Sequence, residues 1–152
     1  MKLFKRTGVA VLLTVMMIIL AVGIGLARRP GSGGHVATTQ DAPWFVSDQA
    51  GVLSSSGIKQ LESNNRSLDS SMGVVIGCVT CNYGKADLGN YAMEQAEKMG
   101  LGANDFIVVL DISGENYWLI QGSGLTELFT DDDCAAYAHE YMEEPFAKGD
   151  YT

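Results

Sequence analysis

The feature that most constrains this chain is an uncharged segment of 21 residues, Thr7–Ala27, near the start of the 152-residue sequence. Its central part, Val9–Leu20, consists almost entirely of Val, Leu, Ile, Met and Ala. As a helix rising 1.5 Å per residue, such a segment spans about 30 Å, the thickness of the hydrocarbon core of a bilayer. It has no polar face to show to water, so the chain is expected to divide into a membrane-directed part and a folded part.

Two interpretations of this segment stay open. Its length and the basic pair Arg28-Arg29 favour an uncleaved signal anchor over residues 1–29, forming one transmembrane helix. A secretory signal is the alternative, because Gly25-Leu26-Ala27 offers a small-residue cleavage site. Basic residues precede the apolar segment, which predicts that its start stays in the cytoplasm. We therefore expect a single-pass protein of the cell membrane with its folded domain outside the cytoplasm, or a secreted domain if the signal is cleaved.

Charge is divided in the same way along the chain. Residues 1–29 contain five basic side chains and no acid, whereas residues 30–152 contain five basic side chains and all 18 acids. A body this acidic repels phosphate backbones, so we expect no nucleic-acid partner. Gly122-Ser123-Gly124 lacks the lysine and the further glycine of a phosphate-binding loop, so we also expect no nucleotide.

Residues 30–43 are predicted to form a flexible linker, and residues 44–152 a small α/β domain. Two short apolar runs, 73–80 and 106–111, read as buried strands, and the segment between them has helical spacing over 87–99. These three segments predict a βαβ unit, expected to be right-handed with parallel strands.

The remaining elements complete a mixed sheet with helices packed on it. The turn Ser113-Gly114 joins strand 106–111 to a strand over 116–121, which predicts an antiparallel hairpin. A helix is expected over 55–71, and another begins at the capping box of Thr130 with Asp133 and ends at Pro145. A short extended segment at 44–48 precedes them.

Cys78-Val79-Thr80-Cys81 has the spacing of a redox pair, but it lies in a predicted strand. Residues three apart in a strand face opposite sides of the sheet, which prevents closure of a disulfide. We therefore expect both cysteines to be buried structural thiols.

A group of acids is the first candidate for a site. The hairpin places the end of strand 116–121 next to the start of strand 106–111, so Asn104 and Asp105 are expected near Asp131, Asp132 and Asp133. Carboxylate and amide oxygens suit Ca²⁺ better than zinc. The same aspartates also complement the positive end of a helix dipole without any metal. Both interpretations remain open from spacing alone.

Several short motifs, taken together, resemble the TPM domain family, which is named for a thylakoid-lumen protein, a photosystem II repair factor and a modulator of acetylcholine receptors. Many bacterial envelope proteins carry this domain. The resemblance runs from Val46 to Tyr151. Its motifs are Val46-x-Asp48-x-Ala50-Gly51-Val52-Leu53-Ser54, Tyr91-Ala92, Gly100-x-Gly102 before Asn104, the apolar strand 106–110, Gly122-x-Gly124-Leu125, and Pro145-Phe146-x-x-Gly149-Asp150-Tyr151.

The chain departs from the family pattern at three places. Asn104-Asp105 stands where the family commonly has Asn-Gly, and Cys78 and Cys81 replace valines. The family domain usually continues into a further helix after the Gly-Asp-Tyr motif, whereas this sequence ends at Thr152. We therefore expect the sequence to be a carboxy-terminally truncated piece of a longer protein.

The resemblance implies calcium binding and adds an acidic position before the first helix. The expected metal-ligand set thus comprises Asp48, Asn104, Asp105, Asp131 and Asp132, with Ca²⁺ as the cofactor. An acid phosphatase activity attributed to some family members implies a metal-dependent enzyme as the alternative function.

The residues themselves favour a binding or assembly module for envelope proteins over an enzyme. No G-x-S-x-G motif occurs, and His139 has no second histidine or cysteine at a metal-binding offset. Phosphoryl transfer needs positive charge around the phosphate, and the folded part offers only Arg66 and four lysines, which are not clustered. Catalytic residues are therefore left unassigned, and the module is expected to contact the membrane through its amino-terminal helix and other envelope proteins through its acidic body.

Overall fold

The computed structural model describes residues 44–148, so the expected anchor (1–29) and linker (30–43) lie outside the described residues. Four strands and three helices follow one another in the order expected from the sequence. They are β1 (Val46–Asp48), α2 (Ser55–Met72), β2 (Ile76–Cys81), α3 (Leu88–Lys98), β3 (Phe106–Asp111), β4 (Asn116–Gln121) and α4 (Asp131–Ala147). Within the described part of the chain, no helix is both long and apolar enough to cross a membrane.

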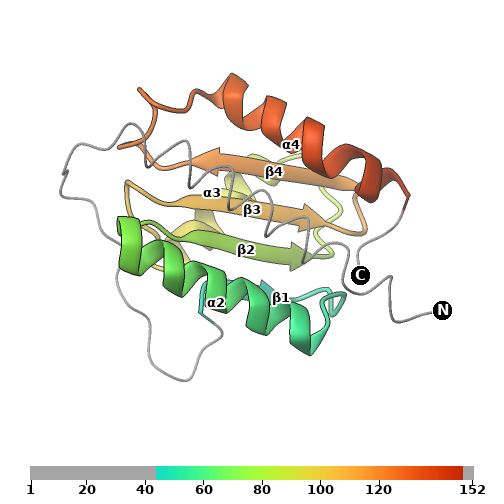
Figure 1. Cartoon of the computed structure of the whole chain (residues 1–152). Helices are drawn as coiled ribbons and strands as arrows, with labels where there is room; N and C mark the ends of the chain where they lie inside the picture. The colour runs from blue at the N-terminus through green and yellow to red at the C-terminus, as the bar shows by residue number, and fades with distance from the viewer. Residues whose placement is uncertain (1–43, 149–152) are drawn as a thin grey trace.

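The strands form one mixed sheet in the order β1-β2-β3-β4 (Figure 1). β1 and β2 run parallel, and so do β2 and β3, with Ile76 opposite Phe106. β4 returns antiparallel to β3, with Phe106 opposite Gln121. The mixed sheet and the hairpin are therefore confirmed, and β4 lies at one edge of the sheet.

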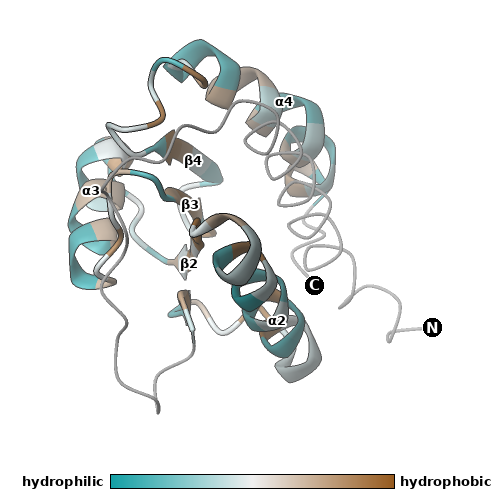
Figure 2. Cartoon of the chain, turned by 60° about the vertical axis from the view of Figure 1, so that its left-hand side comes forward, coloured by the Kyte–Doolittle hydropathy of each residue, from teal (hydrophilic) through white to brown (hydrophobic). Residues whose placement is uncertain are grey.

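Helices cover both faces of the sheet. Helices α2 and α4 pack on one face, around a core that includes Leu61, Phe106 and Met142, and α3 packs on the other through Leu88 and Ala92. Figure 2 shows apolar colouring on the strands between these layers. Both faces of β2 and β3 are buried along their whole length. Burial on both faces explains why these strands are continuous apolar runs rather than alternating patterns.

The two crossovers between the parallel strands have opposite hands. The chain steps in one direction from β1 to β2 to β3, yet α2 and α3 lie on opposite faces of the sheet. In Figure 1 α2 is in front and α3 behind, which makes the β2–α3–β3 crossover right-handed and the β1–α2–β2 crossover left-handed. The loops that follow β1 and β2 therefore diverge toward opposite faces.

Side-chain caps set the starts of the three described helices. The Ser54 hydroxyl accepts from the Gly57 amide, and Asp87 accepts from the Asn90 amide. Thr130 and Asp133 form the predicted capping box, each side chain accepting from the backbone amide of the other. Hydrogen bonds of this kind can be predicted from the sequence because they join residues only three apart.

Two predicted boundaries are wrong. Strand β2 begins at Ile76 rather than residue 73, because Gly73 adopts the left-handed conformation (φ 62°) that ends α2. Helix α4 continues past Pro145 to Ala147. Proline removes only its own amide donor, and the next turn still closes through the bond from the Lys148 amide to the Glu144 carbonyl (3.2 Å).

The cysteines are buried free thiols, as predicted. Cys78 belongs to the core under α2 and α4, whereas Cys81 belongs to the core under α3. Burial raises the pKa of the Cys78 thiol to about 12, so it stays protonated at neutral pH. The pair on β2 therefore has neither the geometry nor the ionisation of a redox site.

Asn65 joins α2 to β2 and is fully buried. Its side-chain oxygen accepts from the Ile76 amide, and its nitrogen donates to the Ile76 carbonyl, both at 2.9 Å. An amide side chain is suited to satisfy both backbone groups of one residue at once.

Replacing Asn65 with leucine should lower the free energy of unfolding by about 2–4 kcal/mol, because both backbone groups of Ile76 lose their buried partner. Urea unfolding of the full chain, followed by circular dichroism, measures this loss. Ser63→Ala on an exposed position of the same helix is the control and should change stability by less than about 0.5 kcal/mol. Equal stability of the two variants would contradict the role given to Asn65.

Candidate functional site

The carboxyl end of β1 carries Asp48, the acid suggested by the family resemblance. One oxygen of its carboxylate accepts from the Val52 amide (3.1 Å) and from the Thr80 hydroxyl, and the other accepts from the Leu53 amide (3.0 Å). The loop that leads into α2 is thus folded around this carboxylate.

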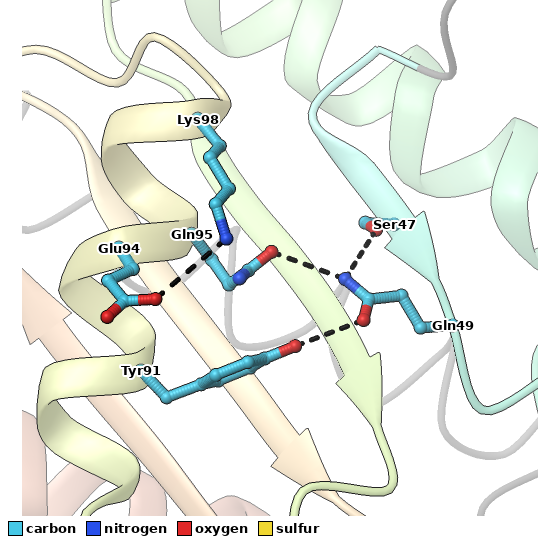
Figure 3. A network of polar contacts seen from close by, with 6 residues as sticks. All are labelled: Ser47, Gln49, Tyr91, Glu94, Gln95 and Lys98. Atoms are coloured by element: carbon cyan, nitrogen blue, oxygen red, sulfur yellow. Dashed lines mark hydrogen bonds and ion pairs between the residues drawn. The ribbon is translucent and has the colours of Figure 1, made fainter.

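This end of the sheet is where the loops after β1 and β2 diverge, a place where ligands often bind in α/β proteins. A polar network occupies it instead (Figure 3). The Gln49 amide nitrogen donates to the Ser47 hydroxyl and to Gln95 (3.3 and 3.2 Å), and the Tyr91 hydroxyl donates to Gln49 (3.0 Å). Burial, the largest of several effects, raises the pKa of Tyr91 and keeps it a donor at neutral pH. These bonds tie the loop after β1 to α3.

Asp105 lies at the opposite end of the sheet, just before β3, and is 2% exposed. One of its carboxylate oxygens accepts from the Val75 amide at 2.8 Å and the other from the Gly102 amide at 2.6 Å. The carboxylate therefore joins the start of β2 to the turn before β3.

Asn104 and Asp131 lie near this same end, as the hairpin predicts. The space beside Gly124 is filled by the Asn104 side chain, so a methyl group there would collide with it. Asp131, in the first turn of α4, accepts from the Gln121 amide nitrogen at 2.8 Å, and Gln121 pairs with the first residue of β3. Close packing of this kind explains the glycines of the 122–124 segment.

The expected ligand set is therefore divided between two places. Asp48 pairs with Thr80 of β2, and Asp105 bonds to Val75, the residue just before β2 and five residues earlier than Thr80, which is about 17 Å at 3.3 Å per residue. The expectation that Asp48 joins the other four residues around one ion is corrected by this placement. Within residues 44–148, no three His, Cys, Asp or Glu side chains are arranged to hold a metal ion.

Asp111 is a buried carboxylate that the sequence analysis did not single out. It lies at the end of β3 and accepts from the amides of Tyr83 (2.9 Å) and Gly84 (2.7 Å) and from the hydroxyl and amide of the turn that follows. The sequence does contain a signal for this role, because Asp111 ends an apolar strand just before a Ser-Gly turn whose donors need an acceptor.

A groove of about 1000 Å³ runs between β4 and α4. Its strand side is the whole stretch 115–120. Its helix side includes Ala135, Ala138 and Phe146, and its acids are Glu115, Asp131, Asp132 and Glu143. The groove therefore combines an edge strand, an apolar wall and negative charge.

Two acids of this groove mark opposite ends of it. Asp131 contacts Gln121 at the end of β4, whereas Glu143 accepts from the Tyr117 hydroxyl (2.5 Å) near the start of the strand. This hydrogen bond, more than the nearby His139, lowers the pKa of Glu143. Burial and the same bond raise the pKa of Tyr117 to about 12. At neutral pH the pair is thus a phenol donating to an ionised carboxylate.

A second groove, of about 830 Å³, lies on the other face between α3 and β4. Asp105 and Asp131 line it together with Glu94 and Glu97 of α3. Met93, which is 55% exposed, also lines it. Asp131 is thus shared by the two grooves.

Comparison with known proteins places the chain in a family. The sequence matches the TPM domain over residues 46–152, so this chain belongs to the TPM domain family. A search of curated proteins found no match. The fold is similar to the solution NMR structure of the N-terminal domain of a P. gingivalis protein, with a TM-score of 0.65 and 24% identity over 85% of this chain and 77% of that one.

Asp105→Asn tests whether this acid holds the fold. An asparagine keeps one oxygen acceptor, but its NH2 group replaces the other oxygen and faces the amide donor of Val75 or Gly102. One buried amide then loses its acceptor, so the free energy of unfolding should fall by about 1–3 kcal/mol. Chemical unfolding at pH 7 measures the change. The control is Glu127→Gln, an exposed acid in a turn outside the helices, which should change stability by less than about 0.5 kcal/mol. A loss no larger than in the control would contradict the structural role of Asp105.

Proposed function

We propose that this member of the TPM domain family is a membrane-anchored, extracytoplasmic module that binds another envelope protein. The observation that supports it best is the groove between β4 and α4, which joins an edge strand to apolar and acidic side chains. Protein interfaces combine the same parts, an apolar centre with a polar rim. Tyr117, in the strand wall, is half-buried with its side chain toward α4, and it is of the aromatic kind enriched at binding hot spots.

The engagement of the strand-end carboxylates also favours binding over catalysis. Asp48, Asp105 and Asp111 each use both oxygens as acceptors for backbone amides. A carboxylate so engaged is poorly placed to act as a general base or a nucleophile.

Four of the five basic side chains in the described residues, all but Lys59, already contact other groups. Arg66 stacks on Trp44 with 4.5 Å between its guanidinium carbon and the ring centre, and Lys85 lies 5.2 Å from the ring centre of Tyr83. Lys98 and Lys148 form ion pairs within their own helices. A phosphatase would need positive charge gathered at one place.

The membrane part of the proposal rests on the sequence. The apolar segment of residues 7–27 is long enough to span a bilayer, and the linker of residues 30–43 reaches at most about 50 Å when extended. The module would therefore meet its partner close to the membrane surface.

Site-specific photo-cross-linking tests this function. A photo-reactive phenylalanine analogue in place of Ala135, an exposed residue that lines the groove, should give one discrete adduct in the membrane fraction of the producing cells. The same analogue at Lys59, an exposed position of α2, should give none. Mass spectrometry should identify the adduct as a protein exposed outside the cytoplasm.

Two results would contradict the binding function. One is the absence of any adduct specific to position 135. The other is hydrolysis of an aryl phosphate by the intact protein that is lost in the double variant Asp131→Asn with Asp132→Asn, which would establish the metal-dependent acid phosphatase instead.

Calcium remains a proposal for the amino-terminal end of β3, where Asn104 and Asp131 supply oxygen donors. Calcium at about 100 times its dissociation constant should stabilise the full chain by about 2.7 kcal/mol, seen as a rise in Tm. Asp131→Asn should abolish the rise, whereas Asp48→Asn, at the other end of the sheet, should keep it. An unchanged Tm of the unsubstituted protein in millimolar calcium would contradict the site.

A further inference from the structure

The outer backbone edge of β4 has no strand partner within residues 44–148, because β4 ends the sheet. The bond from the Gly122 amide to the Asp105 carbonyl (2.7 Å) sets the phase of the β3–β4 ladder. Hydrogen-bonded pairs alternate in an antiparallel ladder, so the backbone groups of Trp118 and Ile120 point to β3. Those of the residues between them point outward.

The outward groups define which kind of molecule fits beside them. The Tyr117 amide donates to the Asn116 side chain (2.8 Å), which leaves Leu119 and Gln121 as the outward residues without a described backbone partner. Donors and acceptors spaced two residues apart along an edge match the backbone of another extended strand.

Charge restricts the sequence of such a strand. Acids lie at both ends of the groove, with Asp131 and Asp132 toward Gln121, and Glu143 near Tyr117. The one lysine that lines the groove, Lys148, is paired with Glu144. Residues 116–121 span about 17 Å as a strand. Basic side chains separated by this length would meet an acid at each end.

We propose that this groove receives an extended segment of another protein as a fifth strand of the sheet, with apolar side chains toward α4 and a basic residue at each end. This inference rests on the proposed binding function and names the kind of partner. A second copy of this chain fits less well, because pairing two β4 edges would bring two acidic grooves together.

A synthetic peptide tests the proposal on the full chain in detergent. The sequence lysine–threonine–valine–threonine–valine–threonine–lysine places lysines and valines on one face and about 20 Å between its ends. Fluorescence anisotropy should show saturable binding that weakens with added salt. The same peptide with glutamates in place of the lysines should not bind.

Backbone methylation separates strand addition from attraction between charges. Two isomers are compared, one N-methylated at the threonines and the other at the valines and the final lysine. Each isomer blocks one edge of the peptide, so one should bind and the other should not. Equal binding of both isomers would overturn the proposal.

Amide hydrogen exchange shows which backbone amides of β4 the bound peptide protects. The bound peptide should slow exchange at Leu119 and Gln121 and leave Trp118 and Ile120, which already bond to β3, unchanged. Unchanged exchange at all four amides would overturn strand addition.

Matched variants of α4 test the charges. Asp132→Lys, inside the groove, should lower the affinity for the peptide by roughly five-fold or more. Glu140→Lys, exposed on the same helix outside the groove, should change that affinity less than two-fold. Equal effects would overturn the assignment of the groove. A cross-link at position 135 combined with no peptide binding would reject the added strand while keeping the binding function. Sedimentation as a dimer through β4 would favour a second copy instead.

Discussion

Two carboxylates hold opposite ends of the sheet, and each does so by accepting backbone amides. Asp105 joins the residue before β2 to the turn before β3, and Asp48 folds the loop after β1. Hydrogen bonds from amides to an ionised acceptor are stronger than those between neutral groups, and a buried amide without a partner is costly. These bonds set the positions of the loop after β1 and of the turn before β3.

Much of the fold could be predicted because its determinants are local. The capping box of Thr130 and the positions of β3 and β4 depend on residues close in sequence, and all are confirmed. The errors arise where local rules compete. Gly73 fits the end of a strand and also a left-handed helix stop, and the structure has the stop. Pro145 is a common helix end, yet α4 continues past it without that one donor.

The candidate site could be predicted only where a single hairpin brings its residues together. The β3–β4 pairing brings Asn104, Asp105 and Asp131 to one end, as expected. The place of Asp48 depends on how β1 enters the sheet, which no local pattern reveals. The role of Asn65 was equally hidden, because a polar residue on the buried side of α2 is explained only by the strand it meets. The groove between β4 and α4 is likewise a tertiary feature with no sequence motif.

The position of Asp131 has a consequence for how the two faces of the domain communicate. Its carboxylate lines both grooves and is held by Gln121, which also accepts from the Cys134 thiol (3.1 Å). A cation held in either groove reduces the negative potential that the other offers. Two cationic groups, one in each groove, would share this carboxylate, so by thermodynamic reciprocity each would weaken the other by the same factor.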